Sequence, residues 1–212
     1  MIVSPFKDVV TRVYKPVQWS KLANGWVKLN TDGSSLGNPG LAGGGGLIRD
    51  EEAKWIVNFA HKIGKTTSFI AELWALRDGL NVCISHNFAA MEVELDAKAN
   101  PNYTNVLVSS LMDDCRVLVS RIPQIHFRHC YREGNRCVDA LARMGGTQAS
   151  DFLILACPPM DLVKLLDFDF HGLYLNRLVQ SICFPLSLLN EFLHTKKRYL
   201  SYSRDRDMSY GL

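Results

Sequence analysis

The chain has 212 residues, of which 47% are hydrophobic, and a formal net charge of +3. This length suggests one medium-sized domain with extensions, and the apolar fraction is enough for a packed core. The mild positive charge permits nucleic-acid binding and excludes a histone-like protein. The sequence contains no run of 18 apolar residues and no apolar signal core at its start. We therefore expect neither a membrane span nor secretion.

Six cysteines are scattered along the chain, and none forms a CxxC pair. This usage predicts reduced thiols and an intracellular protein, nuclear or cytoplasmic. His126, His129 and Cys130 raise the alternative of a zinc site. On a strand, however, His126 and His129 would point to opposite faces, which disfavours zinc.

The first clear pattern is an alternation over residues 26–31, which follows an arm of 24 residues without a period. Val27 and Leu29 face one way, and Lys28 and Asn30 face the other, as in a strand. Asp32 belongs to the second face, and we expect it at the end of this strand. The Gly- and Pro-rich segment that follows predicts a turn and then a second strand ending at residue 50.

A third strand is expected at residues 55–63, after a hairpin turn at 50–52. Residues 68–85 then show helical spacing, with apolar side chains from Phe69 to Leu80 on one stripe. Glu72 lies at the edge of that stripe rather than in the solvent. A carboxylate in this place costs desolvation energy unless it is paired or bound to a metal ion.

The second half of the pattern alternates strands and helices. It predicts a strand at 91–95, a helix at 105–120, a strand at 125–130 and a helix at 135–144. Asp96 follows the first of these strands directly. Asn135 is the expected N-cap of the last helix, and Asp139 borders its packing side.

This order predicts an α/β fold, with a five-stranded mixed sheet flanked by helices. In such sheets the ligand crevice lies at the carboxyl ends of the parallel strands. That crevice can collect Asp32, Glu72, Asp96 and Asp139. Carboxylates without thiols suit a hard divalent cation, and two such cations can cleave a phosphodiester.

Beyond residue 146 the pattern is weaker. Residues 160–168 form a short amphipathic run, and the basic stretch after residue 175 suggests disorder. We therefore expect three parts, namely an N-terminal arm at 1–24, a main domain at 25–146 and a partly disordered C-terminal extension at 147–212.

The motifs TDGSS, FIAELWALRDGL, VELDAK and HCYREGNRCVDALAR occur in this order and at this spacing. In these motifs residues 25–146 resemble a ribonuclease H domain of plant retrotransposon-derived reverse-transcriptase proteins. The resemblance implies the ribonuclease H-like fold. It also implies an endonuclease that hydrolyses the RNA strand of an RNA–DNA hybrid, with no membrane partner, in what we expect to be a monomer.

The resemblance implies roles for individual residues as well. Asp32, Glu72, Asp96 and Asp139 would bind two Mg²⁺ ions, which Mn²⁺ can replace, and His129 would be a mobile catalytic histidine. Substrate contacts are implied at a further set of positions, namely Gly33, Ser35, Asn38, Thr67, Ser68, Lys98 and Asn135. Gly40, like Gly33, would let the backbone approach the sugar edge.

Three departures from the family pattern bear on substrate binding. Ser68 and Phe69 replace a pair of amide side chains, and Lys98 replaces a polar residue. The segment between Asp96 and His129 is too short for the basic helix that some members use to grip substrate. An alternative is therefore a weak or inactive nucleic-acid-binding module, and a third reading is an interaction protein whose tail recruits partners.

Overall fold

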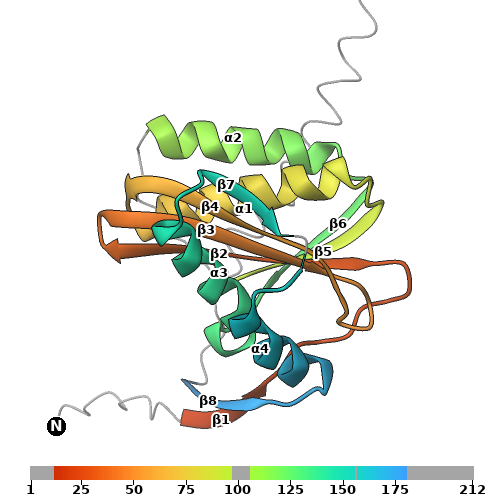
Figure 1. Cartoon of the computed structure of the whole chain (residues 1–212). Helices are drawn as coiled ribbons and strands as arrows, with labels where there is room; N and C mark the ends of the chain where they lie inside the picture. The colour runs from red at the N-terminus through yellow and green to blue at the C-terminus, as the bar shows by residue number, and fades with distance from the viewer. Residues whose placement is uncertain (1–11, 97–105, 156, 181–212) are drawn as a thin grey trace, which may run out of the picture.

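The computed structural model describes residues 12–96, 106–155 and 157–180. Its main sheet has six strands in the order β6-β5-β2-β3-β4-β7, and a separate two-stranded ribbon pairs β1 with β8 (Figure 1). The strands are β1 Arg12–Val17, β2 Val27–Gly37, β3 Gly40–Arg49, β4 Trp55–Thr66, β5 Ala90–Leu95, β6 Gln124–His129, β7 Phe152–Leu155 and β8 Leu175–Gln180. The helices are α1 Ser68–Ser85, α2 Val106–Ser120, α3 Arg136–Thr147 and α4 Met160–Phe170, with a short 3₁₀ helix η1 at Arg132–Gly134.

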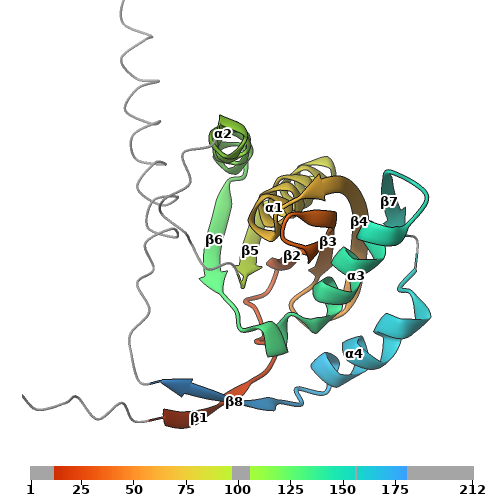
Figure 2. The same ribbon diagram turned by 90° about the vertical axis from the view of Figure 1, so that its left-hand side faces the viewer.

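The sheet combines a meander with parallel crossovers. Strands β2, β3 and β4 are antiparallel neighbours, whereas β5 runs parallel to β2 and β6 runs parallel to β5. Helices α1 and α2 lie on one side of the sheet and α3 lies on the other (Figures 1 and 2). This confirms the predicted α/β fold with a mixed sheet between helices.

The first strand is longer than its sequence pattern predicts. The β2–β3 ladder runs without interruption from the pair Lys28–Arg49 to the pair Gly37–Gly40. Asp32 therefore lies in the middle of β2, and the expectation of a strand end was wrong. The turn predicted in the Gly- and Pro-rich segment is confined to residues 38–39, and the glycines that follow form the start of β3, as predicted.

Glycines let these helices approach the sheet closely. A Cβ on Gly33 would lie 2.1 Å from the backbone nitrogen of Glu72 in α1, and a Cβ on Gly45 would lie 2.5 Å from that of Ala142 in α3. Both distances are far below van der Waals contact. The glycines of β2 and β3 therefore bring the two helices that carry acidic residues onto opposite faces of the sheet.

Three strands were missed in the sequence. Phe152–Leu155 forms β7 and pairs with β4, so the sheet has six strands and not five. Arg12–Val17 and Leu175–Gln180 pair with each other, in segments interpreted as an arm and a disordered tail. These strands have only four to six residues. They form through partners distant in sequence, which a local pattern does not reveal. Residues 181–212 lie outside the described part of the chain.

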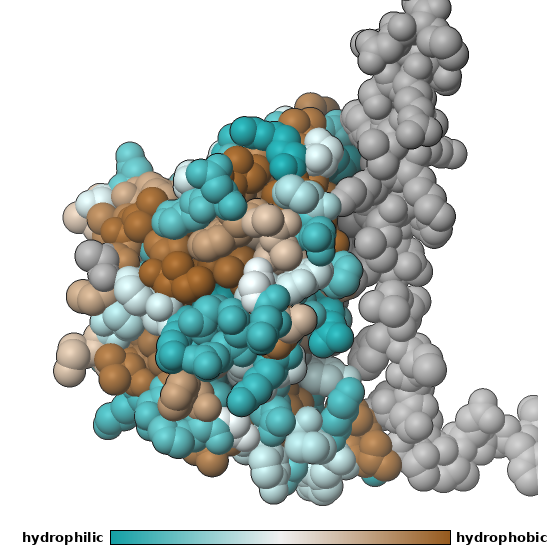
Figure 3. Space-filling view, turned by 90° about the vertical axis from the view of Figure 1, so that its right-hand side faces the viewer, coloured by the Kyte–Doolittle hydropathy of each residue, from teal (hydrophilic) through white to brown (hydrophobic). Residues whose placement is uncertain are grey.

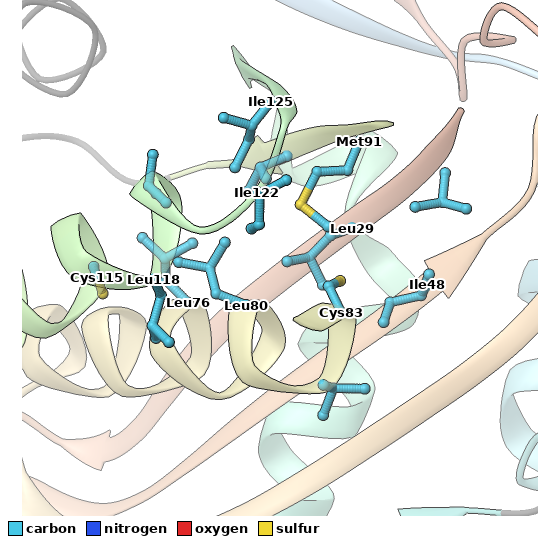
Figure 4. Packing of buried hydrophobic residues seen from close by; sticks show 14 of the residues in the cluster. Leu29, Ile48, Leu76, Leu80, Cys83, Met91, Cys115, Leu118, Ile122 and Ile125 are labelled. Carbon is cyan, nitrogen blue, oxygen red and sulfur yellow. The ribbon is translucent and has the colours of Figure 1, made fainter. Parts of the chain in front are cut away.

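Apolar side chains fill the space between the sheet and the two helices α1 and α2. Figure 4 shows this core, in which Leu29 of β2, Leu80 of α1 and Met91 of β5 are fully buried. On the outer face seen in Figure 3, hydrophilic residues occupy much of the centre and the lower part. None of the helices in the described segments is long and apolar enough to cross a bilayer.

Candidate active site

Three carboxylates from different elements meet at one place. Asp32, Glu72 and Asp96 each offer an oxygen, and these oxygens all lie within 4.8 Å of one another. Asp96 follows β5 directly, as predicted. The parallel register pairs Asn30 with Glu94, so Asp32 and Asp96 occupy matching positions two residues further along. Glu72 completes the group from the second turn of α1.

Gly33 places Glu72 in this group. Its backbone N–H donates a hydrogen bond to the Glu72 carboxylate. A side chain at this position would collide with the backbone of α1. The need for glycine next to Asp32 is thus explained by helix packing. Gly40 is required by the β2–β3 hairpin instead, because a Cβ there would lie 1.8 Å from the carbonyl oxygen of Leu36.

Burial raises the pKa values of all three carboxyl groups, and neighbouring carboxylates raise them further. Desolvation, with the charges of Asp96 and Asp139, raises the pKa of Asp32 to about 7. Desolvation and then the Asp32 charge raise the pKa of Glu72 well above its usual range, and desolvation raises the pKa of Asp96. Glu72 Oε2 is buried and has no hydrogen-bond partner among the residues that the structure describes. A divalent cation would relieve both the repulsion and this unsatisfied oxygen, so these residues fit a hard metal ion.

Asp139 lies close to the group but outside it. It is in the first turn of α3, where one carboxylate oxygen pairs with Arg132 at 3.0 Å and the other with Arg143 at 2.8 Å. Its negative charge raises the pKa values of Asp32 and Asp96, so Asp139 is near enough to interact electrostatically with the group. The structure therefore brings three of the four predicted carboxylates together, whereas the fourth, Asp139, forms ion pairs with two arginines.

His129 ends β6 beside the acidic group. It pairs in register with Leu95, the residue before Asp96, and its side chain is exposed. Its positive charge, when present, lowers the pKa of Asp96. The His129 ring contacts the Tyr131 ring edge-on, with 5.2 Å between the centroids.

Four of the predicted substrate contacts gather where the β2–β3 hairpin meets the start of α1. Asn38 Oδ1 accepts from the backbone N–H of Ser68 at 3.1 Å. Thr67 Oγ1 caps α1 by accepting from the N–H of Ile70 at 3.3 Å. Ser35 Oγ donates to the carbonyl oxygens of Gly37 at 2.5 Å and Thr66 at 2.8 Å. Lys98 lies outside the described residues.

Asn135 is the N-cap residue of α3, as predicted, but its side chain makes no capping hydrogen bond to the helix. Its amide is 2% exposed, donates to the carbonyl oxygen of Thr31 at 3.0 Å and accepts from Asn30 Nδ2 at 3.3 Å. Asn135 therefore ties the start of α3 to the backbone just before Asp32, and its amide does not face solvent. Phe69 packs against apolar residues of α1 and α2, as predicted.

Sequence reasoning missed a buried network of charges under the acidic group. Lys28 is 0% exposed and pairs with Glu94 at 2.7 Å and Glu92 at 3.0 Å. Asn30 donates to Glu94 at 2.9 Å and accepts from Arg49 at 2.9 Å. Lys28 and Asn30 share a face of β2 with Asp32. The alternation of polar and apolar residues was the available signal in the sequence. A polar strand face, however, suggests side chains in contact with solvent and not a buried network.

Residues 30–145, more than half of the chain, match the protein family described as reverse transcriptase-like. The chain belongs to the reverse transcriptase-like family. It is also 32% identical, over 167 residues, to an Arabidopsis thaliana protein provisionally named a ribonuclease H protein. That alignment covers 76% of this chain and 27% of the relative, so the chain spans about a quarter of the relative's length.

Solved structures of ribonucleases H share the fold. The RNase H1 of Halobacterium salinarum has a TM-score of 0.53 at 24% identity and covers 57% of this chain and 96% of its own. The N-terminal RNase H domain of a Mycobacterium tuberculosis protein has a TM-score of 0.54 at 24% identity, and the match covers 57% of this chain and 93% of that domain. An RNase H1 isolated from compost by a metagenomic approach has a TM-score of 0.52 at 26% identity, and the match covers 57% of this chain and 95% of that enzyme. The fold of this reverse transcriptase-like protein is therefore ribonuclease H-like.

Proposed function

We propose that this protein is a magnesium-dependent endonuclease that hydrolyses the RNA strand of RNA–DNA hybrids. The observation that carries the proposal is the group of Asp32, Glu72 and Asp96, with oxygens within 4.8 Å of one another in a ribonuclease H-like fold. Family membership and the 32% identity to the Arabidopsis relative support the substrate class. The chain spans only 27% of that relative's length, so its activity is proposed here and not taken over from the relative.

The three grouped carboxylates would hold Mg²⁺, for which Mn²⁺ can substitute, and Asp139 would join them after leaving Arg132 and Arg143. Bound divalent ions supply charge neutralisation at the scissile phosphate and an acidified water. His129 is exposed beside Asp96, where its ring can take up or deliver a proton.

Hybrid selectivity requires contact with the 2′-hydroxyl groups of the RNA strand. The cluster of Asn38, Thr67 and Ser68 lies beside Glu72 at the start of α1 and offers amide and hydroxyl groups. We assign the substrate strands to this surface. Thr67 Oγ1 caps the helix as an acceptor, so its hydroxyl hydrogen would serve as a donor to a phosphate oxygen.

The proposal is tested by incubating the chain with a hybrid labelled on its RNA strand, with and without Mg²⁺. We expect metal-dependent cleavage that leaves a 3′-hydroxyl and a 5′-phosphate, and no cleavage of a DNA duplex of the same sequence. Binding of the hybrid without cleavage would instead identify the inactive nucleic-acid-binding module.

A further inference from the structure

The β1–β8 ribbon contacts the segment that joins His129 to α3. Arg177 of β8 makes two hydrogen bonds to the carboxylate of Glu133, at 2.6 and 2.9 Å. Its guanidinium lies 5.0 Å from the centroid of the Tyr131 ring, and Lys15 Nζ of β1 lies 5.3 Å from it. Lys15 and Arg177 are direct partners in the ribbon, so both cations come from one face of it.

A third contact lies at the end of the same segment. Val17 of β1 is 8% exposed, and its Cγ1 is 3.4 Å from the position that a Cβ on Gly134 would occupy. The ribbon thus contacts residues at the start, middle and end of the four-residue segment 131–134.

The segment 131–134 contacts two candidate catalytic residues, His129 and Asp139. On one side Tyr131 contacts the ring of His129, and on the other Arg132 pairs with Asp139. Both strands of the ribbon lie outside residues 30–145, the part that matches the family. The ribbon therefore lies outside the matched region and contacts the segment next to His129.

We propose that the β1–β8 ribbon is a positioning element, in which Arg177 and Lys15 fix the segment Tyr131–Gly134 and thereby orient His129 for proton transfer. The bidentate ion pair sets the direction of Glu133, and the two cations hold the plane of Tyr131. Tyr131 in turn limits the rotation of the His129 ring. The contribution to cleavage rests on the proposed function, whereas the bracing of the segment does not.

The test compares the full chain with Arg177→Ala and Glu133→Gln by amide hydrogen exchange, which reports local opening of residues 131–135. Both variants should exchange faster there and remain unchanged in β2–β4. Asn176→Ala, an exposed neighbour in β8, is the matched control and should leave exchange as it is. Unchanged exchange of the segment in both Arg177→Ala and Glu133→Gln would overturn the proposal.

Kinetics on the labelled hybrid provide the second readout. Misplacement of a catalytic group by about 1 Å costs up to ~10²-fold in rate, so Arg177→Ala should lower kcat by roughly ten- to a hundredfold. KM should change little, since the ribbon acts on proton transfer and not on binding. The double variant Arg177→Ala/Glu133→Gln should be no slower than Arg177→Ala alone, because Arg177→Ala already removes the contact with Glu133.

The outcomes separate the two proposals. A parent chain that does not cleave the hybrid contradicts the proposed function, while hydrogen exchange still decides the role of the ribbon. Equal kcat values for the parent and Glu133→Gln, together with faster exchange in the variant, would overturn the orienting of His129. If Arg177→Ala lowers the melting temperature strongly, Glu133→Gln gives the decision in a folded protein.

Discussion

Arg49 of β3 and Asp169 of α4 form a buried ion pair with 2.7 Å between nitrogen and oxygen. Arg49 belongs to the part of the chain that matches the family, and Asp169 lies 24 residues beyond it. Arg49 is 1% exposed and also donates to Asn30, two residues before Asp32. Helix α4 therefore supplies the counter-charge for a network that lies directly beneath the acidic group.

Removing this counter-charge should destabilise the whole domain. Asp169→Ala leaves the Arg49 guanidinium buried without its carboxylate, which typically costs about 3–5 kcal/mol. Denaturant unfolding measures the loss. Asp167→Ala, on the same helix with a 71% exposed side chain, should stay near the parent. Equal midpoints for Asp169→Ala and the parent would contradict a structural role for α4.

Asp32→Asn should abolish cleavage and leave the fold intact. Asparagine keeps the shape of the side chain but removes the charge that faces Glu72 and Asp96. A divalent ion then loses one of three carboxylates within 4.8 Å. The measurements are cleavage of the labelled hybrid and the circular dichroism spectrum. Activity within a few-fold of the parent would rule out Asp32 as a metal ligand.

The metal-free protein should lose stability as the pH rises from about 4 to 7. The pKa of Asp32 is raised from 3.8 to about 7 on folding, so the folded state binds the proton more tightly than the unfolded state. In this window the folded state holds more protons, and the free energy of unfolding falls with increasing pH. Thermal unfolding in a metal chelator checks this. The decrease of the melting temperature with pH should be smaller in Asp32→Asn. A decrease as steep as in the parent would show that groups other than Asp32 cause the pH dependence.

Magnesium should stabilise the parent at pH 7 by mass action. It relieves the repulsion among Asp32, Glu72 and Asp96, so millimolar Mg²⁺ should raise the melting temperature. Glu72→Gln should reduce the shift, because it removes a carboxylate ligand whose Oε2 is unpaired within the described part of the chain. No shift in the parent, but stabilisation on neutralising one carboxylate, would indicate repulsion without metal binding.

His129→Ala should slow turnover by roughly 10²-fold, the low end for loss of an acid–base group. The magnesium-induced rise in melting temperature should match that of the parent, because His129 is outside the group of ligand oxygens. Single-turnover cleavage and thermal scans give the two readouts. A parent-like rate would make His129 a strand-end residue without a catalytic role.

Ser68→Asn should tighten hybrid binding by restoring an amide that the resemblance implies at this position. One added hydrogen bond contributes about 0.5–1.5 kcal/mol, or up to roughly tenfold in affinity. Ser68 begins α1 and is partly exposed, so the longer side chain has room. Titration of a labelled hybrid at fixed salt checks this, with Ser110→Asn on the exposed side of α2 as control. Equal gains in both variants would indicate a general effect and not a groove contact.

Local sequence patterns determined most of the elements that carry the site. Residues 68–85 form the predicted helix, and Asp96 follows its strand as expected, since apolar periodicity and strand alternation are properties of short windows. The resemblance identified the carboxylates, of which the structure groups Asp32, Glu72 and Asp96. These features depend on residues close to one another in the chain.

Only the tertiary structure decided what distant segments do. Lys28 and Asn30 look solvent-facing in an alternating strand, yet they are buried because α3, α4 and Trp19 cover that face, with Lys28 4.8 Å from the Trp19 ring. The β1–β8 ribbon joins the two ends of the described chain, and neither strand has a pattern of its own. A short strand is stable only when its partner is present, and a buried charge only when its counter-charge is. Both partners come from far along the chain, where no local window reaches them.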